Sequence, residues 1–224
     1  RHRFVVPSSE VENALRNAEH VFFARDYEQL GGFEPSGVVV DVGAYAGFYS
    51  VRASRRSRLV VAVEANPVMC HYLRVNAKLN RRVNIVPVCA AVGGESGKRP
   101  LFIAEDMVNS SLLESYVREV SAIRGRVEVR VLTLSGVLSL LGIEHVDLLK
   151  VDVEGAEEEV IRGSSEVLEP SFVRRIVVEV HPPFCKASRI AEMLRPRYRV
   201  AVVVSDETPS QVFLYAWGPG GPSR

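Results

Sequence analysis

Short apolar segments alternate with amphipathic segments along most of this chain, and this alternation limits the fold more than any other feature. The apolar segments predict strands at 38–42, 59–63, 84–88, 146–152, 175–180, 198–204 and 211–217. The segments between them have helical spacing and predict helices at 47–55, 67–79, 133–142, 155–168 and 186–195. The first five strands are almost wholly apolar, which is typical of parallel strands covered on both faces. The pattern predicts an α/β fold with a Rossmann-like, doubly wound, seven-stranded and mostly parallel sheet.

The two ends of the chain and one internal stretch depart from this alternation. The last two strands are joined by a short turn containing "DETPS" and predict an antiparallel hairpin at one edge of the sheet. In the less regular stretch 93–132, "RVEVRVLTL" alternates with a period of two and indicates an extra strand. Residues 9–30 predict a helix that begins with a capping box of Ser9 and Glu12. We therefore expect a helical extension at 1–35, a main domain at 36–217 and a flexible tail at 218–224.

The composition excludes several classes of protein. The chain has 224 residues, of which 25% are charged, and a net charge of +1. This charge gives no overall attraction to phosphate, so nucleic acid is not an expected partner. No apolar run approaches the roughly 20 residues that span a bilayer, and the N-terminal residues do not resemble a signal peptide. The three cysteines, Cys70, Cys89 and Cys185, are widely spaced, which argues against a zinc site or a disulfide and favours a cytoplasmic location.

Carboxylates stand where the predicted strands end. Asp41 closes the first strand and Glu64 the second, Asp152 and Glu154 follow the fourth, and Glu179 lies near the end of the fifth. In open α/β sheets, ligands bind at the carboxyl ends of the strands. Burying a carboxylate without a partner costs several kcal/mol. A shared ligand-binding cleft therefore explains these positions better than chance does.

The turn after the first strand, "VVVDVGAYAGFYSV" (38–51), narrows the choice of ligand. A nicotinamide-binding turn requires G-x-G-x-x-G, but that frame puts Tyr45 and Phe48 at the second and third glycines. The phosphate-binding loop G-x-x-x-x-G-K-[ST] is also absent. Glu64, at the end of the next strand, can accept hydrogen bonds from both hydroxyls of a ribose. The pattern favours an adenosine compound without phosphate, such as S-adenosylmethionine, whose positive charges suit acidic surroundings.

Longer motifs connect this turn to a known family. Together with "VVAVEANPVMCHYLRVNAKLN" (60–80), the turn resembles the first two motifs of class I S-adenosylmethionine-dependent methyltransferases. The segments "AAVGGESG" (90–97), "NSSLL" (109–113), "VRVLTLSGVL" (129–138) and above all "VDLLKVDVEGAEEEVIRGSSEVL" (146–168) resemble the FkbM family. The resemblance covers about residues 36–183 and implies that the main domain is a methyltransferase domain. One departure is "EANP", where the family commonly has E-P-N-P.

The resemblance also implies a set of cofactor contacts. Those expected around the amino acid end of S-adenosylmethionine are Asp41, Gly43, Ala44 and Gly47, with Tyr45 in the same turn. Glu64 would hold the ribose, and Ala65 is a further contact. Ala90, in the segment after the third strand, would flank the adenine, and Asp152 would lie near the transferred methyl group.

The fourth and fifth strands supply the candidate catalytic residues. Because these strands should be neighbours, Asp152, Glu154, Glu179 and His181 are expected to converge. Asp152 or His181 could remove the proton of an acceptor hydroxyl. The same side chains could bind a divalent metal ion through oxygen ligands, although no metal site is predicted. Lys150 lies inside the fourth strand and is expected to pair with Asp152 or Glu179.

The helix after the fourth strand begins with Glu157, Glu158 and Glu159. Carboxylates in the first turn interact favourably with the helix dipole. We interpret all three as stabilising residues without a catalytic role.

These observations lead to one main hypothesis and two alternatives. FkbM-like enzymes are usually associated with O-methylation, so the resemblance implies methyl transfer to a hydroxyl of a sugar or another small-molecule or glycan acceptor. The first alternative is an RNA nucleoside methyltransferase that uses its arginine-rich helices as a phosphate track. The second is a protein that binds S-adenosylmethionine without catalysis. The helix at 9–30 could cover the pocket or form the contact of a homodimer, and the sequence leaves both open.

Overall fold

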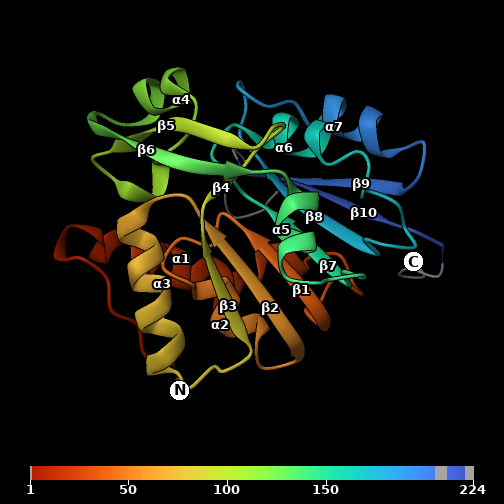
Figure 1. Ribbon diagram of the computed structural model, residues 1–224, viewed down its shortest axis with the longest axis horizontal. Coiled ribbons are helices and arrows are strands. Elements are labelled where there is room, and N and C mark those ends of the chain that lie inside the picture. The colour runs from red at the N-terminus through yellow and green to blue at the C-terminus, as the bar shows by residue number, and fades with distance from the viewer. Residues whose placement is uncertain (1, 205–210, 220–224) are drawn as a thin grey trace.

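A seven-stranded sheet forms the centre of the computed structural model, which describes residues 2–204 and 211–219 (Figure 1). Its strands follow the order β3-β2-β1-β7-β8-β10-β9. Their bounds are β1 Gly37–Val42, β2 Ser57–Glu64, β3 Ile85–Cys89, β7 Leu148–Val151, β8 Arg175–Val180, β9 Arg199–Val204 and β10 Val212–Trp217. The first five of these run parallel to one another. The predicted fold class is confirmed, and the order reverses between β1 and β7, where α/β sheets bind their ligands.

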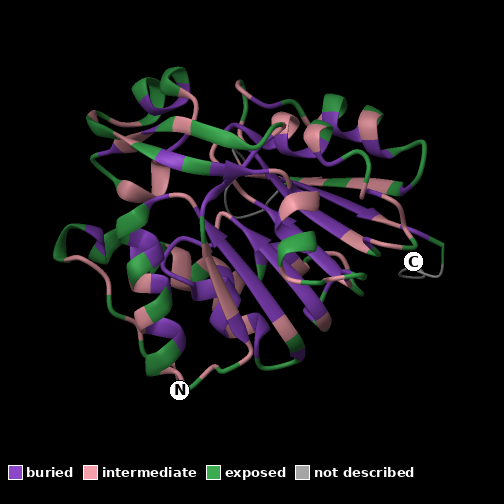
Figure 2. Cartoon of the chain, in the orientation of Figure 1, coloured by how far each residue is buried: buried purple, intermediate pink, exposed green. Residues whose placement is uncertain are grey.

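Helices cover both faces of the sheet because alternate apolar side chains of each strand point to opposite faces. The helices on one face are α2 Phe48–Ala53 and α3 Pro67–Leu79, together with the N-terminal segment. Those on the other face are α5 Leu134–Leu140, α6 Glu157–Gly163 and α7 Ala187–Leu194. The central strands are buried along almost their whole length, as Figure 2 shows. This burial on both faces explains why their sequences are nearly continuous apolar runs.

The C-terminal strands form the predicted antiparallel edge. Strand β10 lies between β8 and β9 and runs antiparallel to both. The expected turn "DETPS" lies outside the described residues. The predicted hairpin is confirmed in its strands and in their direction.

A smaller sheet occupies the stretch that looked irregular in sequence. Its three strands follow the order β4-β6-β5, with β4 Ala91–Val92, β5 Gly97–Ala104 and β6 Ile123–Leu132. Between β5 and β6 lie the 3-10 turn η4 Met107–Asn109 and helix α4 Glu114–Val120. The extra strand predicted from "RVEVRVLTL" is confirmed as part of β6. Figure 1 shows this sheet above the end of the main sheet where β4 leaves β3.

The segment before β1 is not the single helix that was predicted. It consists of η1 Ser8–Glu10, α1 Val11–Glu19, the π-helical turn η2 His20–Ala24 and the 3-10 turn η3 Asp26–Glu28. The left-handed backbone of Arg25, with φ 56°, ends the helical run. The expected capping box does not form, because Ser9 lies inside η1 and the residue before α1 is Glu10, which makes no side-chain cap.

A disulfide joins Cys70 to Cys89, so the interpretation of the cysteine spacing as evidence against a disulfide was wrong. Cys89 stands beside Glu64 in the register of β3 and β2, and α3 begins shortly after Glu64. The first turn of α3 therefore lies close to the end of β3, and the two Cα atoms are 5.7 Å apart. This proximity depends on strand order, which cysteine spacing does not reveal. Cys185 is buried and free.

The helices in the described part of the chain are short or contain charged residues. None of them combines the length and the apolar composition needed to cross a bilayer.

Candidate active site

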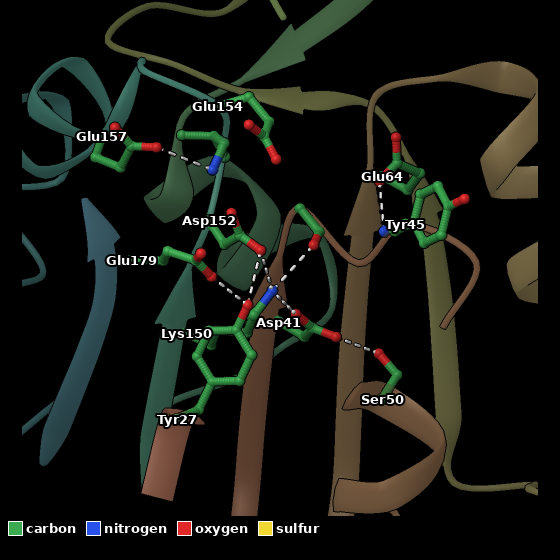
Figure 3. Close-up of polar contacts among 12 residues, drawn as sticks. Tyr27, Asp41, Tyr45, Ser50, Glu64, Lys150, Asp152, Glu154, Glu157 and Glu179 are labelled. Atoms are coloured by element: carbon green, nitrogen blue, oxygen red, sulfur yellow. Dashed lines mark hydrogen bonds and ion pairs between the residues drawn. The ribbon is translucent and has the colours of Figure 1, made fainter. Parts of the chain in front are cut away.

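A cavity opens at the carboxyl ends of β1, β2, β3 and β7 and encloses about 810 Å³ of empty space, including a part open to solvent. The residues proposed from sequence that line it are Gly43, Ala44, Tyr45, Glu64, Ala65, Ala90, Asp152 and Glu154. Asp41, Gly47 and His181 do not line it. The strand-end carboxylates therefore lie in one region of the fold (Figure 3). Only some of them line the cavity.

Glu64 is held rigidly at the rim of this cavity. One of its carboxylate oxygens accepts the backbone N–H of Tyr45 at 2.7 Å, and the other accepts the backbone N–H of Asn66 at 2.7 Å. Burial raises the pKa of Glu64 to about 7, although these two hydrogen bonds oppose the shift. Each oxygen keeps a free lone pair. Glu64 can therefore accept further hydrogen bonds from a ligand in a fixed orientation.

The turn after β1 requires glycine because two backbone segments meet there. Gly43 has φ 80°, and a Cβ atom at this position would lie 1.6 Å from the carbonyl oxygen of Asp152. The N–H groups of Gly43 and Ala44 both donate to the carbonyl oxygen of Val63, at 3.0 Å each. The turn is thus attached to β2 on one side and to the end of β7 on the other.

Gly47 has a different role in the same turn. It caps α2 with φ 88°, and a Cβ atom there would lie 2.6 Å from Cδ1 of Leu73 on α3. The absence of a side chain lets α2 and α3 pack closely. The structure therefore places Gly47 in helix packing and away from the cavity wall.

Lys150 links the strands beneath the cavity. Its Nζ lies 3.1 Å from Oδ1 of Asp41 and 3.2 Å from Oδ2 of Asp152, and it donates to the carbonyl oxygen of Gly43 at 3.0 Å. Burial opposes its charge, but the two carboxylates more than compensate, so the pKa of Lys150 is raised. The pairing with Asp152 was predicted and is confirmed, whereas the pairing with Asp41 was missed.

Asp41 is completely buried and supports this lysine from below the cavity. Its second oxygen accepts the hydroxyl of Ser50 at 2.6 Å. Burial raises the pKa of Asp41, while Lys150 and Ser50 oppose the shift. Asp41 acts on the cavity through Lys150, because its own side chain does not reach the cavity.

Tyr27 is a residue of the site that sequence reasoning missed. Its hydroxyl lies 2.6 Å from Oε2 of Glu179 and 3.0 Å from Oδ2 of Asp152, and its ring centroid lies 4.8 Å from Nζ of Lys150. Burial and the two carboxylates raise the pKa of Tyr27 well above its ordinary value. Tyr27 comes from η3 of the N-terminal segment, where one aromatic residue in a helical pattern gave no functional signal.

Asp152, Glu154 and His181 converge as predicted. One oxygen of each carboxylate and one ring nitrogen of His181 all lie within 4.8 Å of one another. Burial raises the pKa of Glu154 to about 8. Burial also opposes the charged form of His181, but Glu154 and Glu157 raise its pKa well above the ordinary value. Tyr116 on α4 donates a short hydrogen bond to Glu154.

Glu157 also contacts this group, which its interpretation as a helix-stabilising residue did not include. It is fully buried, and its Oε1 lies 2.9 Å from Nδ1 of His181. The same oxygen accepts the backbone N–H of Gly155 at 3.0 Å and that of Val153 at 3.3 Å. Glu157 therefore orients the imidazole of His181, and its wide separation from His181 in sequence concealed this role.

Two segments that carried no strong sequence signal form the outer walls of the cavity. Asn17 and Val21 come from α1 and η2, and the loop around Met107 comes from the smaller sheet. Glu10 joins the two walls, since its carboxylate accepts the hydroxyl of Tyr45 at 2.9 Å and the N–H of Met107 at 3.1 Å. The N-terminal segment is thus part of the cavity.

Two solved structures share this fold. The structure superposes on a crystal structure of methyltransferase FkbM from Methylobacillus flagellatus KT with a TM-score of 0.57 and 14% identity, covering 89% of this chain and 48% of that one. It also matches a precorrin-6y C5,15-methyltransferase from Geobacter metallireducens GS-15 with a TM-score of 0.53 and 16% identity, covering 96% and 94% of the two chains. Both show the Rossmann-like methyltransferase fold.

Sequence comparison gives the family. Residues 41–198 match the model of the methyltransferase FkbM domain, and the chain therefore belongs to the FkbM family of S-adenosylmethionine-dependent methyltransferases. Methyltransferase sdnD of Sordaria araneosa is 31% identical over an alignment of 173 positions, and this alignment covers 65% of this chain and 66% of sdnD. The 31-O-demethyl-FK506 methyltransferase FkbM of Streptomyces tacrolimicus is 28% identical over an alignment of 203 positions, which covers 78% of this chain and 77% of that protein. The chain spans just under two thirds of sdnD and about half of the solved FkbM protein.

Proposed function

We propose that the protein transfers the methyl group of S-adenosylmethionine to a hydroxyl oxygen of a sugar or another small molecule. The observation that supports this most strongly is the cavity at the ends of β1, β2 and β7, where Glu64, Asp152 and Glu154 face a common space. A cationic, phosphate-free ligand suits these carboxylates, whereas a dinucleotide would bring its phosphates against them.

The donor groups of the cavity fit the cofactor. Glu64 offers two fixed carboxylate oxygens to the ribose hydroxyls, and Ala65 and Ala90 leave room beside it for a flat adenine. Gly43 and Tyr45, in the turn after β1, would border the amino acid end of the cofactor. The bound cofactor supplies an electrophilic methyl group on a positively charged sulfur.

The residues of the chain orient the acceptor, exclude water and handle its proton. Methyl transfer is a displacement in line with the bond to sulfur, so alignment of the acceptor oxygen is the main task. Asp152, Glu154 and His181 lie together beside the end of β7 and are the groups that can take up or stabilise the hydroxyl proton. Tyr27 and Lys150 act as positioning residues, because both donate a hydrogen bond to Oδ2 of Asp152.

Two observations favour a small acceptor with a hydroxyl group. The cavity wall contains Met107, Val108 and Leu112, which suit the carbon skeleton of a small molecule. The name of the Streptomyces relative states O-methyl chemistry on FK506 for that protein. An open cavity also supports an enzyme over a protein that only binds the cofactor.

RNA methylation is the second candidate. A tRNA(Phe) (4-demethylwyosine(37)-C(7)) aminocarboxypropyltransferase of Methanocaldococcus jannaschii is 42% identical to this chain, but only over 55 residues, 24% of its length. Basic side chains do gather in a second hollow lined by Arg25, Arg52, Arg55 and Arg56. None of these arginines lines the candidate active site, which is acidic. The arrangement favours the small acceptor.

Calorimetry tests the cofactor part of the proposal. The protein should bind S-adenosylmethionine and not NAD. Glu64→Ala should weaken binding at least about tenfold, since hydrogen bonds to a charged group contribute about 1.5–3 kcal/mol. Glu95→Ala removes an exposed acid outside the cavity and is the matched control. Binding of NAD alone would refute the proposal.

Labelling tests the acceptor part. The protein is incubated with methyl-labelled cofactor and with fractionated small-molecule, glycan and RNA extracts of the source organism. We expect label in a hydroxyl-containing small-molecule or glycan fraction. Label only in RNA would replace the first candidate with the second, and uptake in no fraction despite cofactor binding would favour a non-catalytic protein.

A further inference from the structure

The cluster of Asp152, Glu154 and His181 has the geometry of a cation site. Nε2 of His181 lies 3.4 Å from Oε2 of Glu154 and 3.9 Å from Oδ1 of Asp152, and all three ligand-type atoms fall within 4.8 Å of one another. Two of these residues follow β7 and the third follows β8, so two elements deliver the ligand atoms to one point. Two carboxylates and one imidazole form a ligand set that divalent metal ions use.

His181 is oriented as a metal-binding histidine is. Its Nδ1 lies 2.9 Å from Oε1 of Glu157, an oxygen that also accepts two backbone N–H groups. This oxygen can only accept, so Nδ1 carries the proton and Nε2 is the nitrogen that faces Asp152 and Glu154. A carboxylate bound to the far nitrogen of a ligating histidine is the usual outer-shell arrangement of metal sites.

Asp152 supplies an independent observation. Its Oδ2 is paired with Tyr27 and Lys150, but Oδ1 is buried and accepts no hydrogen bond. A buried carboxylate oxygen without a partner is costly. This same oxygen of Asp152 lies 3.9 Å from Nε2 of His181. The structure thus directs an unsatisfied, negatively charged atom into the cluster.

Among the described side chains around the cluster, acidic groups outnumber basic groups. Five buried or half-buried carboxylates are linked here through Lys150, His181 and Tyr27, namely those of Asp41, Asp152, Glu154, Glu157 and Glu179. Lys150 is paired with Asp41 and Asp152, and His181 is the basic group beside Glu154 and Glu157. An added cation would relieve the mutual repulsion of the carboxylates.

We propose that Asp152, Glu154 and His181 bind one divalent cation such as Mn²⁺ through one oxygen of each carboxylate and Nε2 of the histidine. Mn²⁺ accepts both oxygen and nitrogen ligands. The role of the ion rests on the proposed function: with three protein ligands it keeps positions open for the acceptor hydroxyl, which it would polarise as a Lewis acid. The alternative occupant of the cluster is a proton on Nε2 of His181.

The test is a titration of the full chain with Mn²⁺, followed by the loss of the electron paramagnetic resonance signal of free Mn²⁺. We expect one saturable site. Glu154→Gln and His181→Asn should each raise the dissociation constant at least about tenfold, because even outer-shell partners contribute that much. Glu95→Gln, an exposed acid outside the cluster, should leave it unchanged. If His181→Asn does not fold, Glu154→Gln still carries the test.

Absence of a saturable site, or equal binding by native protein and both cluster variants, overturns the proposal in favour of a protonated His181. Calorimetry with S-adenosylmethionine on the same samples separates this result from failure of the proposed function. Cofactor binding without Mn²⁺ binding refutes the metal site alone. Mn²⁺ binding without cofactor binding refutes the proposed function and leaves the cation site in place.

Discussion

Replacing Lys150 by methionine should destabilise the protein strongly, because it removes the one lysine from a buried group of acids. The side chain is 3% exposed, and its two partner carboxylates, on Asp41 and Asp152, are 0% and 15% exposed. Methionine retains most of the volume, so the main change is the loss of charge. Breaking a buried ion pair in this way costs about 3–5 kcal/mol of the free energy of unfolding.

The loss of stability in Lys150→Met should depend on pH, and the pKa of Asp41 determines the direction of this dependence. Burial already raises the pKa of Asp41 above its ordinary value of 3.8, and Lys150 opposes this shift. Without Lys150 the pKa of Asp41 rises further, so the folded variant binds a proton that the unfolded chain releases at a lower pH. The free energy of unfolding of Lys150→Met therefore falls as the pH rises from the ordinary pKa of Asp41 to its raised folded value. The stability of Lys150→Met should therefore be closer to that of the native protein near pH 3.8 than at neutral pH.

Urea unfolding at the two pH values measures both effects. Lys98→Met is the matched control, because Lys98 forms an exposed pair with Glu128 at 3.0 Å, and such pairs contribute at most about 1 kcal/mol. The double variant Asp41→Asn/Lys150→Met should recover part of the lost stability, since it removes the unpaired charge. A Lys150→Met loss no larger than that of Lys98→Met, or no recovery in the double variant, would refute the reasoning.

Three further predictions concern the disulfide, the turn after β1 and the ionisation of Glu64. Cys70→Ser should lower the free energy of unfolding by about 3 kcal/mol, which is the chain-entropy value for a loop of this length. Added reductant should destabilise the native protein and have little effect on the variant. Equal sensitivity of the two proteins to reductant would contradict the disulfide. Gly43→Ala should lower the melting temperature and abolish cofactor binding, because its Cβ would collide with the carbonyl oxygen of Asp152; near-native melting would show that the turn can move. Burial raises the pKa of Glu64 to about 7, so the affinity for the cofactor should increase as the pH rises through this value and Glu64 ionises. The affinity of Glu64→Gln, measured by calorimetry, should not change with pH. An affinity of the native protein that does not change with pH would exclude the ionised carboxylate as the ribose ligand.

The sequence alone was sufficient for the properties that depend on neighbours along the chain. The seven strands of the main sheet, the parallel and antiparallel parts and the helix Pro67–Leu79 all follow from apolar periodicity and local breaks in it. Glu64 and Asp152 could be placed at the cavity because strand ends are local features, and carboxyl ends of parallel strands meet at one edge of the sheet. Family motifs added the class of chemistry.

The tertiary structure was needed for several side-chain contacts that the sequence did not predict. Tyr27 reaches Asp152 across 125 positions of sequence, Glu157 orients His181, and Asp41 stands directly beside Lys150 in the register of β1 and β7. Each pairing depends on strand order and on the path of a loop or of the N-terminal segment. Strand order and loop paths depend on contacts between residues far apart in sequence, which form together as the whole chain packs. Local sequence patterns therefore do not predict them.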